Sequence, residues 1–256
     1  MVRVKISWLF TVLINFFGCA DELCLYTRKL SAPPIQLEKN EKIIVYSPFR
    51  TGSTLVYNIL NYLYEDQTEN SADRFNKRVI KTHYPQHKRY FNHLKERSCF
   101  GYVFVTIRHP REAAVSYCNL VDIYERGKAL EAINLMKEQY ELLKEFVSKE
   151  KDGLEVTVLR YEEFNDQLAS ILVEIERVFR CTISIEDREE IFRLFNRKKM
   201  KEISESLGSS KSFDPETELR GGHVDKRRNR YVLSSSFQKI VCERLESVVS
   251  LWGYDI

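Results

Sequence analysis

The stretch Ser47-Pro-Phe-Arg-Thr-Gly-Ser-Thr54 decides the fold of this chain. The apolar run Ile43-Ile-Val-Tyr46 before it predicts a buried strand, and apolar residues at helical spacing after it predict a helix over residues 53–64. A strand, a tight loop and a helix N-terminus aim several backbone N–H groups at one point, where the helix dipole adds partial positive charge. The stretch therefore predicts an anion site.

The loop residues suit a phosphate or a sulfate. Gly52 permits close approach of the backbone, and Ser53 and Thr54 supply hydroxyl groups beside the helix start. Arg50 can hold an oxyanion through paired charged hydrogen bonds. The nucleotide-binding Walker A loop has the pattern Gly-x-x-x-x-Gly-Lys-Ser/Thr, but here Ser47 replaces its first Gly and Ser53 replaces its Lys.

The remaining segments alternate between two kinds of pattern. Short apolar runs predict strands at 78–82, 102–107 and 154–159, and longer amphipathic stretches predict helices at 112–124, 130–147 and 166–179. This alternation predicts an α/β protein with a three-layer, P-loop-like fold, in which helices flank a central parallel sheet. Ligands of such sheets bind beyond the carboxyl ends of the strands. We interpret the apolar stripe of 130–147 as core packing and not as a binding groove.

Four further motifs follow predicted strands or lie near the C-terminus. They are Ile80-Lys-Thr-His-Tyr-Pro85, Val105-Thr-Ile-Arg-His-Pro-Arg-Glu-Ala-Ala-Val-Ser-Tyr117, Leu159-Arg-Tyr-Glu162 and Leu219-Arg-Gly-Gly-His223. In the second, an Arg at a strand end precedes a Ser on the next helix by eight positions, so both side chains can converge on one phosphate.

Together with the loop, these motifs resemble those of sulfotransferases that use 3′-phosphoadenosine-5′-phosphosulfate (PAPS). That family's loop for the 5′-phosphosulfate reads Pro-x-Lys/Arg-Ser/Thr-Gly-Ser/Thr-Thr, and Pro48 to Thr54 match it. The resemblance extends from Lys42 to Tyr254. It implies a PAPS co-substrate, 3′,5′-ADP as the second product, and in-line transfer of a sulfuryl group to a hydroxyl or amine without a metal.

The resemblance also implies a role for each matched residue. His83 would be the general base, with Lys81 and Arg50 balancing charge at the transferred group; a histidine with a pKa of about 6.5 suits a base at neutral pH. The implied nucleotide ligands are Arg50, Thr51, Gly52, Ser53, Thr54, Arg108, Ser116, Tyr161, Arg220 and Gly222.

Some positions depart from the family pattern. Gly221 replaces a Lys of the late Arg-Lys-Gly motif, and Leu55 replaces a Trp that stacks on adenine in many cytosolic members. Two other classes stay open: a P-loop kinase, which would need Mg²⁺ and a carboxylate after a later strand, and a protein that binds PAPS or its product without catalysis. For Arg108, the alternative is an ion pair with a structural carboxylate.

Bulk composition limits the partners. A formal net charge of +3 gives no reason to expect a nucleic acid. The cysteines have no spacing typical of a zinc site. We expect a small-molecule, carbohydrate or protein acceptor, whose identity the sequence does not specify.

The N-terminus resembles an export signal. Arg3 and Lys5 precede an apolar run from Ile6 to Gly18, followed by Cys19 and Ala20. We predict a signal peptide or short membrane anchor at 1–20, a lead-in at 21–40 and the sulfotransferase domain at 41–256. Lipid attachment at Cys19 and a packed N-terminal element are the alternatives. The protein would then be exported or membrane-associated, and cytoplasmic if this segment is not a signal.

Overall fold

The structure is a computed structural model. It describes residues 34–38, 41–64, 78–83, 101–121, 123, 125–149, 154–208, 212, 214, 219, 221, 232 and 234–255. The predicted signal at 1–20 and most of the predicted lead-in lie outside the described residues, so both stay predictions. Within the described part of the chain, no helix is long and apolar enough to cross a membrane.

A parallel sheet forms the centre of the described domain. Its strands are β1 (Lys42–Tyr46), β2 (Val79–Thr82), β3 (Gly101–Ile107) and β4 (Glu155–Arg160). They lie in the order β2-β1-β3-β4, and every neighbouring pair is parallel. The predicted α/β class with a central parallel sheet is confirmed.

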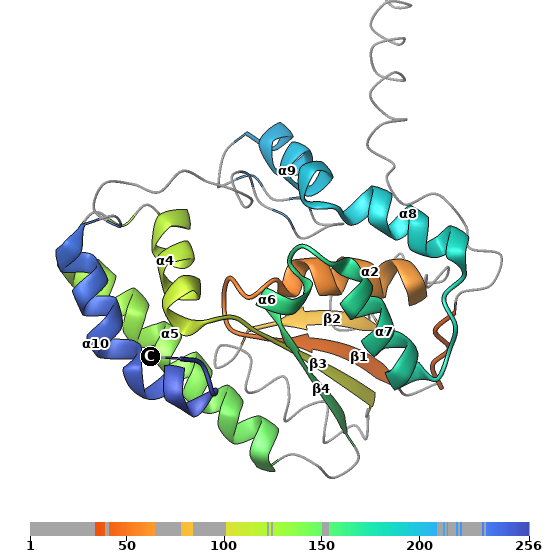
Figure 1. Cartoon of the computed structure of the whole chain (residues 1–256), viewed down its shortest axis with the longest axis horizontal. Coiled ribbons are helices and arrows are strands. Elements are labelled where there is room, and N and C mark those ends of the chain that lie inside the picture. The colour runs from red at the N-terminus through yellow and green to blue at the C-terminus, as the bar shows by residue number, and fades with distance from the viewer. Residues whose placement is uncertain are drawn as a thin grey trace, which may run out of the picture. The chain divides into compact units, whose positions relative to one another are not determined.

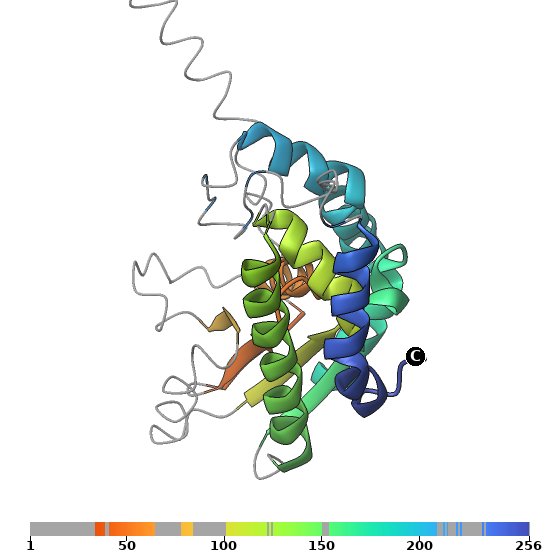
Figure 2. The same ribbon diagram turned by 90° about the vertical axis from the view of Figure 1, so that its left-hand side faces the viewer.

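Helices cover both faces of this sheet (Figures 1 and 2). The helices on one face are α4 (Pro110–Leu120), α5 (Arg126–Lys149) and α10 (Ser235–Leu251). The helices towards the other face are α2 (Ser53–Tyr64), α6 (Tyr161–Phe164) and α7 (Leu168–Phe179), with α8 (Ile185–Phe195) packed on α2 and followed by α9 (Arg197–Ser206). The predicted three layers are therefore present.

Alternation along the strands produces this layering. Ile44 and Tyr46 of β1 pack into one cluster with α4, α5 and α10, whereas Ile43 and Val45 are buried but lie outside that cluster. Successive side chains of a strand point to opposite faces, so a strand that is apolar throughout needs cover on both. The apolar stripe predicted for 130–147 belongs to the same cluster through Ile133, among others, which agrees with core packing.

The register aligns the carboxyl ends of the strands. Tyr46 pairs with Thr82 on one side and with Val105 on the other, and Ile107 pairs with Arg160. The residues that come next along the chain are Ser47, His83, Arg108 and Tyr161. The topology thus brings the segments that follow the four strands to one edge of the sheet.

Candidate active site at the carboxyl ends of the strands

The loop between β1 and α2 has an unusual backbone. Gly52 has a φ of 85°, and a Cβ built on it would lie 2.8 Å from the rings of Tyr161 and Phe164. Arg50 has a φ of 65°, which a residue with a side chain adopts at a cost of about 1–2 kcal/mol. Such strain persists where the surroundings enforce it, often at functional sites. A glycine is therefore required at position 52 for two reasons: its positive φ, and the lack of room for a Cβ beside the two rings.

Buried hydroxyl groups tie this loop to the end of β3. Thr106 donates its backbone N–H to Ser47 Oγ at 3.1 Å, and its own hydroxyl lies 2.7 Å from the same atom. Thr51 Oγ1 lies 2.8 Å from Thr106 Oγ1 and 3.0 Å from the carbonyl oxygen of Pro48. All three hydroxyl-bearing residues are fully buried. The Thr51 side chain therefore links the loop to its own backbone at Pro48 and to β3.

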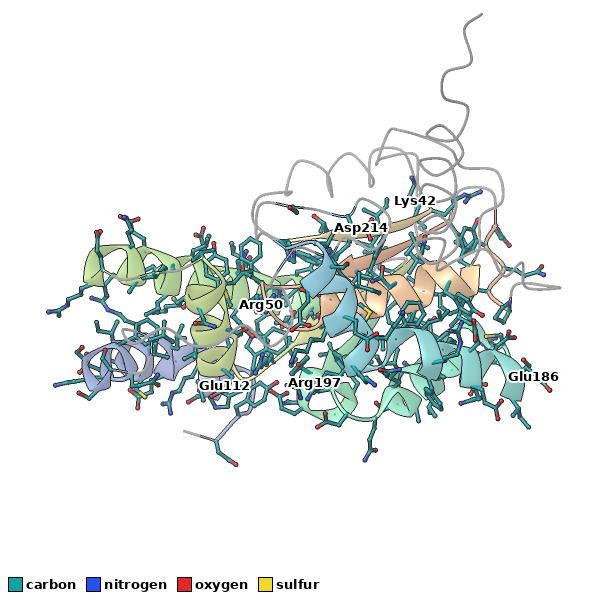
Figure 3. All side chains as sticks on the ribbon, turned by 90° about the horizontal axis from the view of Figure 1, so that it is seen from above. Lys42, Arg50, Glu112, Glu186, Arg197 and Asp214 are labelled. Carbon is teal, nitrogen blue, oxygen red and sulfur yellow. The ribbon has the colours of Figure 1, made fainter. Side chains whose placement is uncertain are left out.

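Arg50 reaches from the loop to α4. Its Nε donates a hydrogen bond to Ser116 Oγ at 3.1 Å. Figure 3 shows Arg50 near this helix, which also contains Glu112. Burial, together with the nearby positive charge of Arg108, lowers the pKa of Arg50 from 12.5 to about 10. Two cations held this close favour an anion between them.

Arg108 lies between a carboxylate and an aromatic ring. Its guanidinium is 4.6 Å from the ring centroid of Tyr161, and its Nη2 is 3.6 Å from Glu112 Oε2. The Glu112 side chain is half-exposed, so this pair is weak. Arg108 does form the ion pair that the sequence left open as an alternative role. Its partner Glu112 is half-exposed, however, and is not a buried structural carboxylate. The positive charge of Arg108 also acts on Arg50, so the two guanidinium groups lie in the same part of the site.

Lys81 and Thr54 meet at the other end of the loop. Lys81 Nζ donates to Thr54 Oγ1 at 2.9 Å and lies 5.9 Å from the ring centroid of Tyr57. The lysine is buried near the carboxyl end of strand β2, beside the N-terminus of α2. A buried ammonium placed next to a helix N-terminus, where the dipole is also positive, suits a ligand of negative charge.

His83 follows β2 directly and contacts the loop between β1 and α2. Its Nδ1 is 2.8 Å from the carbonyl oxygen of Ser47, and its ring is 4.5 Å from that of Phe49. A carbonyl oxygen only accepts hydrogen bonds, so Nδ1 must bear the proton. In the neutral ring the lone pair then lies on Nε2. The Nδ1–Ser47 hydrogen bond therefore fixes the tautomer and makes Nε2 the nitrogen that can accept a proton.

Two predicted ligands lie outside the described residues, namely Arg220 and Gly222. The remaining predicted site residues come together at one edge of the sheet: Arg50, Thr51, Gly52, Ser53, Thr54, Lys81, His83, Arg108, Ser116 and Tyr161. In the described part of the chain, no three His, Cys, Asp or Glu side chains gather as a metal site would need.

The sequence interpretation missed residues that support the site from behind. Gln139 Oε1 accepts the N–H of Phe49 at 3.1 Å, and the hydroxyl of Tyr140 donates to the carbonyl of Arg108 at 2.6 Å. A signal was present, because Gln139 occupies a core position of an amphipathic helix, three residues after Met136. A polar residue there needs a buried partner.

The fold is one already known from solved structures. A mouse sulfotransferase, SULT7A1 complexed with PAP, is 14% identical with a TM-score of 0.50, and the match covers 84% of this chain and 88% of that one. A retinol dehydratase in a complex with retinol and PAP is 15% identical with a TM-score of 0.51, over 88% of this chain and 84% of that one. No protein-family model and no curated protein matches the sequence. The chain therefore shares the fold of these two proteins.

Proposed function

We propose that this protein is a sulfotransferase that moves a sulfuryl group from PAPS to a hydroxyl or amine acceptor. The observation that supports it most is the convergence of two arginines, Arg50 and Arg108, with His83 at one edge of the sheet. Two neighbouring cations suit a nucleotide with two separate anionic groups, and a histidine held by one nitrogen suits a general base. Both structural neighbours are complexes with PAP.

The nucleotide would bind along the strand ends. The 5′-phosphosulfate would take the N–H groups of the loop, the hydroxyls of Ser53 and Thr54, and the Arg50 guanidinium. The 3′-phosphate would lie between Arg108 and Ser116, and the adenine would lie against Tyr161. The Arg50–Ser116 hydrogen bond of 3.1 Å supports this placement, because it joins a residue proposed for the 5′ end to one proposed for the 3′-phosphate. Arg220 and Gly222 remain proposed ligands.

In the proposed step, Nε2 of His83 takes the acceptor's proton as the acceptor oxygen or nitrogen bonds to sulfur. The bond between sulfur and the bridging phosphate oxygen breaks in line, and 3′,5′-ADP leaves with the electron pair. Lys81 and Arg50 stabilise the charge that grows on that oxygen. The bond from Nδ1 to Ser47 fixes the ring for this role and stabilises the imidazolium that forms.

The acceptor is proposed to be a small molecule, a carbohydrate or a protein. One of the structural neighbours holds retinol, a small alcohol, which supports placing apolar alcohols in a first acceptor screen beside sugars and tyrosine peptides. The segment 1–20 is proposed to export the protein or attach it to a membrane.

Two measurements test the proposal. Thermal shifts should be larger with 3′,5′-ADP than with ADP and Mg²⁺, because only the former offers a 3′-phosphate to Arg108. Transfer from ³⁵S-labelled PAPS should fall by about 10²–10⁴-fold in His83→Asn, the typical contribution of a general base, while 3′,5′-ADP binding persists. A preference for ADP with Mg²⁺ would favour a kinase, and a full transfer rate in His83→Asn would refute the assigned base.

A further inference from the structure

Two adjacent residues of α5 reach the backbone beside the two arginines of the site. Gln139 Oε1 accepts the N–H of Phe49, the residue before Arg50, at 3.1 Å. The Tyr140 hydroxyl donates to the carbonyl of Arg108 itself at 2.6 Å. Both side chains are fully buried. A single turn of one helix therefore contacts both segments that present the guanidinium groups.

This turn of α5 is itself held in place. Trp252, just after α10, donates its indole N–H to the carbonyl of Tyr140 at 3.1 Å, and the two rings meet edge to face with centroids 6.4 Å apart. Met136 and Leu143, one turn to either side, are fully buried in the core between α5 and the sheet. The helix is thus a rigid support. Gln139 and Tyr140 attach the backbone at Phe49 and at Arg108 to it through hydrogen bonds.

The chemistry of the pair differs from ordinary core packing. Gln139 Nε2 is buried and has no hydrogen-bond partner among the described residues. An unsatisfied buried polar group costs about 1–3 kcal/mol, more than an apolar side chain of the same shape would. Burial raises the pKa of Tyr140 well above its ordinary value, so this phenol remains a hydrogen-bond donor. The glutamine therefore satisfies the Phe49 N–H at the cost of one buried donor that is unpaired in the described part of the chain.

We infer that Gln139 and Tyr140 are positioning residues: Gln139 holds the loop that carries Arg50, and Tyr140 holds the segment that carries Arg108 and so selects nucleotides that have a 3′-phosphate in addition to a 5′ one. The inference rests on the proposed function, since it takes the 5′ end to Arg50 and the 3′-phosphate to Arg108. Gln139 fixes the loop on which every 5′-nucleotide depends. Tyr140 fixes only the segment that meets the 3′-phosphate.

Calorimetric titration of the full chain with 3′,5′-ADP and with 5′-AMP tests this division. Loss of one neutral buried hydrogen bond corresponds to about a two- to tenfold change in an equilibrium. We expect Tyr140→Phe to weaken 3′,5′-ADP binding by that factor and to leave 5′-AMP binding within about twofold. We expect Gln139→Met to weaken both nucleotides by the same factor.

Tyr62→Phe is the matched control, because Tyr62 is a buried tyrosine that packs against Phe195, a residue of α8, on the other side of the sheet. It should leave both affinities and their ratio unchanged. An unaltered ratio in Tyr140→Phe, whether both affinities fall together or neither falls, would overturn the inference. A wild-type chain that binds no 3′,5′-ADP would instead overturn the proposed function, and the inference with it.

Discussion

Arg50 should contribute to ligand binding at the expense of the unliganded fold. The substitution Arg50→Met removes the charge and keeps an unbranched side chain of similar length. In the wild-type protein, burial and the charge of Arg108 lower the pKa of Arg50 to about 10, so the folded chain binds this proton less tightly than the unfolded chain does. Charged Arg50 therefore destabilises the folded state until a ligand of opposite charge binds.

The size of the effect follows from the same lowering. One pKa unit corresponds to about 1.4 kcal/mol, so the fall from 12.5 sets an upper limit of about 3 kcal/mol on this cost. Arg50 is partly exposed, and solvent screening reduces the figure to about 1–2 kcal/mol. The variant also loses the hydrogen bond to Ser116, which is worth about 1 kcal/mol. We expect unliganded Arg50→Met to be as stable as the wild type or more stable by about 1 kcal/mol.

Urea unfolding without and with 3′,5′-ADP measures the stability of the unliganded protein and the stabilisation that the ligand adds. A ligand at a hundred times its Kd stabilises the wild type by about 2.7 kcal/mol, and this gain should vanish in Arg50→Met. The unfolded chain holds the Arg50 proton at higher pH than the folded chain, so wild-type stability relative to the variant should rise as the pH passes through about 10.

Arg180→Met is the matched control for Arg50→Met. Arg180 is the other non-glycine residue with positive φ in the described part of the chain, and it is exposed at the end of α7. It should not alter nucleotide binding. An Arg50→Met protein that loses more than about 1 kcal/mol without nucleotide, yet is still stabilised by 3′,5′-ADP, would refute this reasoning and make Arg50 a structural residue.

Three further predictions address the loop, the lysine and the N-terminus. Gly52→Ala should cost about 2–4 kcal/mol of unfolding free energy and abolish 3′,5′-ADP binding, because its Cβ would meet Tyr161 and Phe164 at positive φ; Gly127→Ala, in open space in α5, should be neutral or stabilising in the same unfolding assay. Lys81→Met should lower kcat for sulfuryl transfer by about 10²–10³-fold with a small change in KM for PAPS, and an effect on KM alone would contradict its role at the transferred group. N-terminal sequencing after expression in a secreting cell should find a mature chain that begins at Asp21, whereas a retained Met1 would exclude cleavage.

The sequence predicted the first half of the domain well because its signals are local. The run before the loop and the helix after it were expected at 43–46 and 53–64, and the structure has β1 at Lys42–Tyr46 and α2 at Ser53–Tyr64. A buried parallel strand is apolar throughout, and a strand followed by a glycine-containing loop and a helix leaves few alternatives. The helix expected at 112–124 is observed at Pro110–Leu120, with the proline in its first turn.

The later helices were not predicted, although their N-termini had recognisable signals. Ser184, Asn196 and Ser234 each accept a hydrogen bond from the N–H group three residues on, at the starts of α8, α9 and α10. In α9 only Met200 and Ser204 are buried, so the apolar periodicity that indicates a helix is weak there. Capping residues predict where such helices begin, but only tertiary packing makes them stable.

For the candidate site too, one part could be predicted from the sequence and another could not. That the segments following the strands meet at one edge was predictable, because parallel strands in register end at one edge whatever the length of chain between them; the nucleotide-binding roles of these residues stay predictions. The hydrogen bond from Arg50 to Ser116 was not predictable, because it depends on the positive φ of Arg50, and arginine gives no sequence signal for that angle.

The unpredicted support from α5 changes how the site should be understood. Arg50 lies on a strained loop and contacts Ser116, and Arg108 pairs with a half-exposed carboxylate; these side-chain contacts do not by themselves fix the backbones that carry the two guanidinium groups. Their backbones, however, are tied to neighbouring residues of one buried helix through Phe49 and Tyr140. Two mobile cations would repel each other and separate in the absence of a ligand, at the cost of reassembly upon binding. Backbone anchors prevent that separation, and the repulsion retained in the unliganded site is then released when an anion binds between the two guanidinium groups.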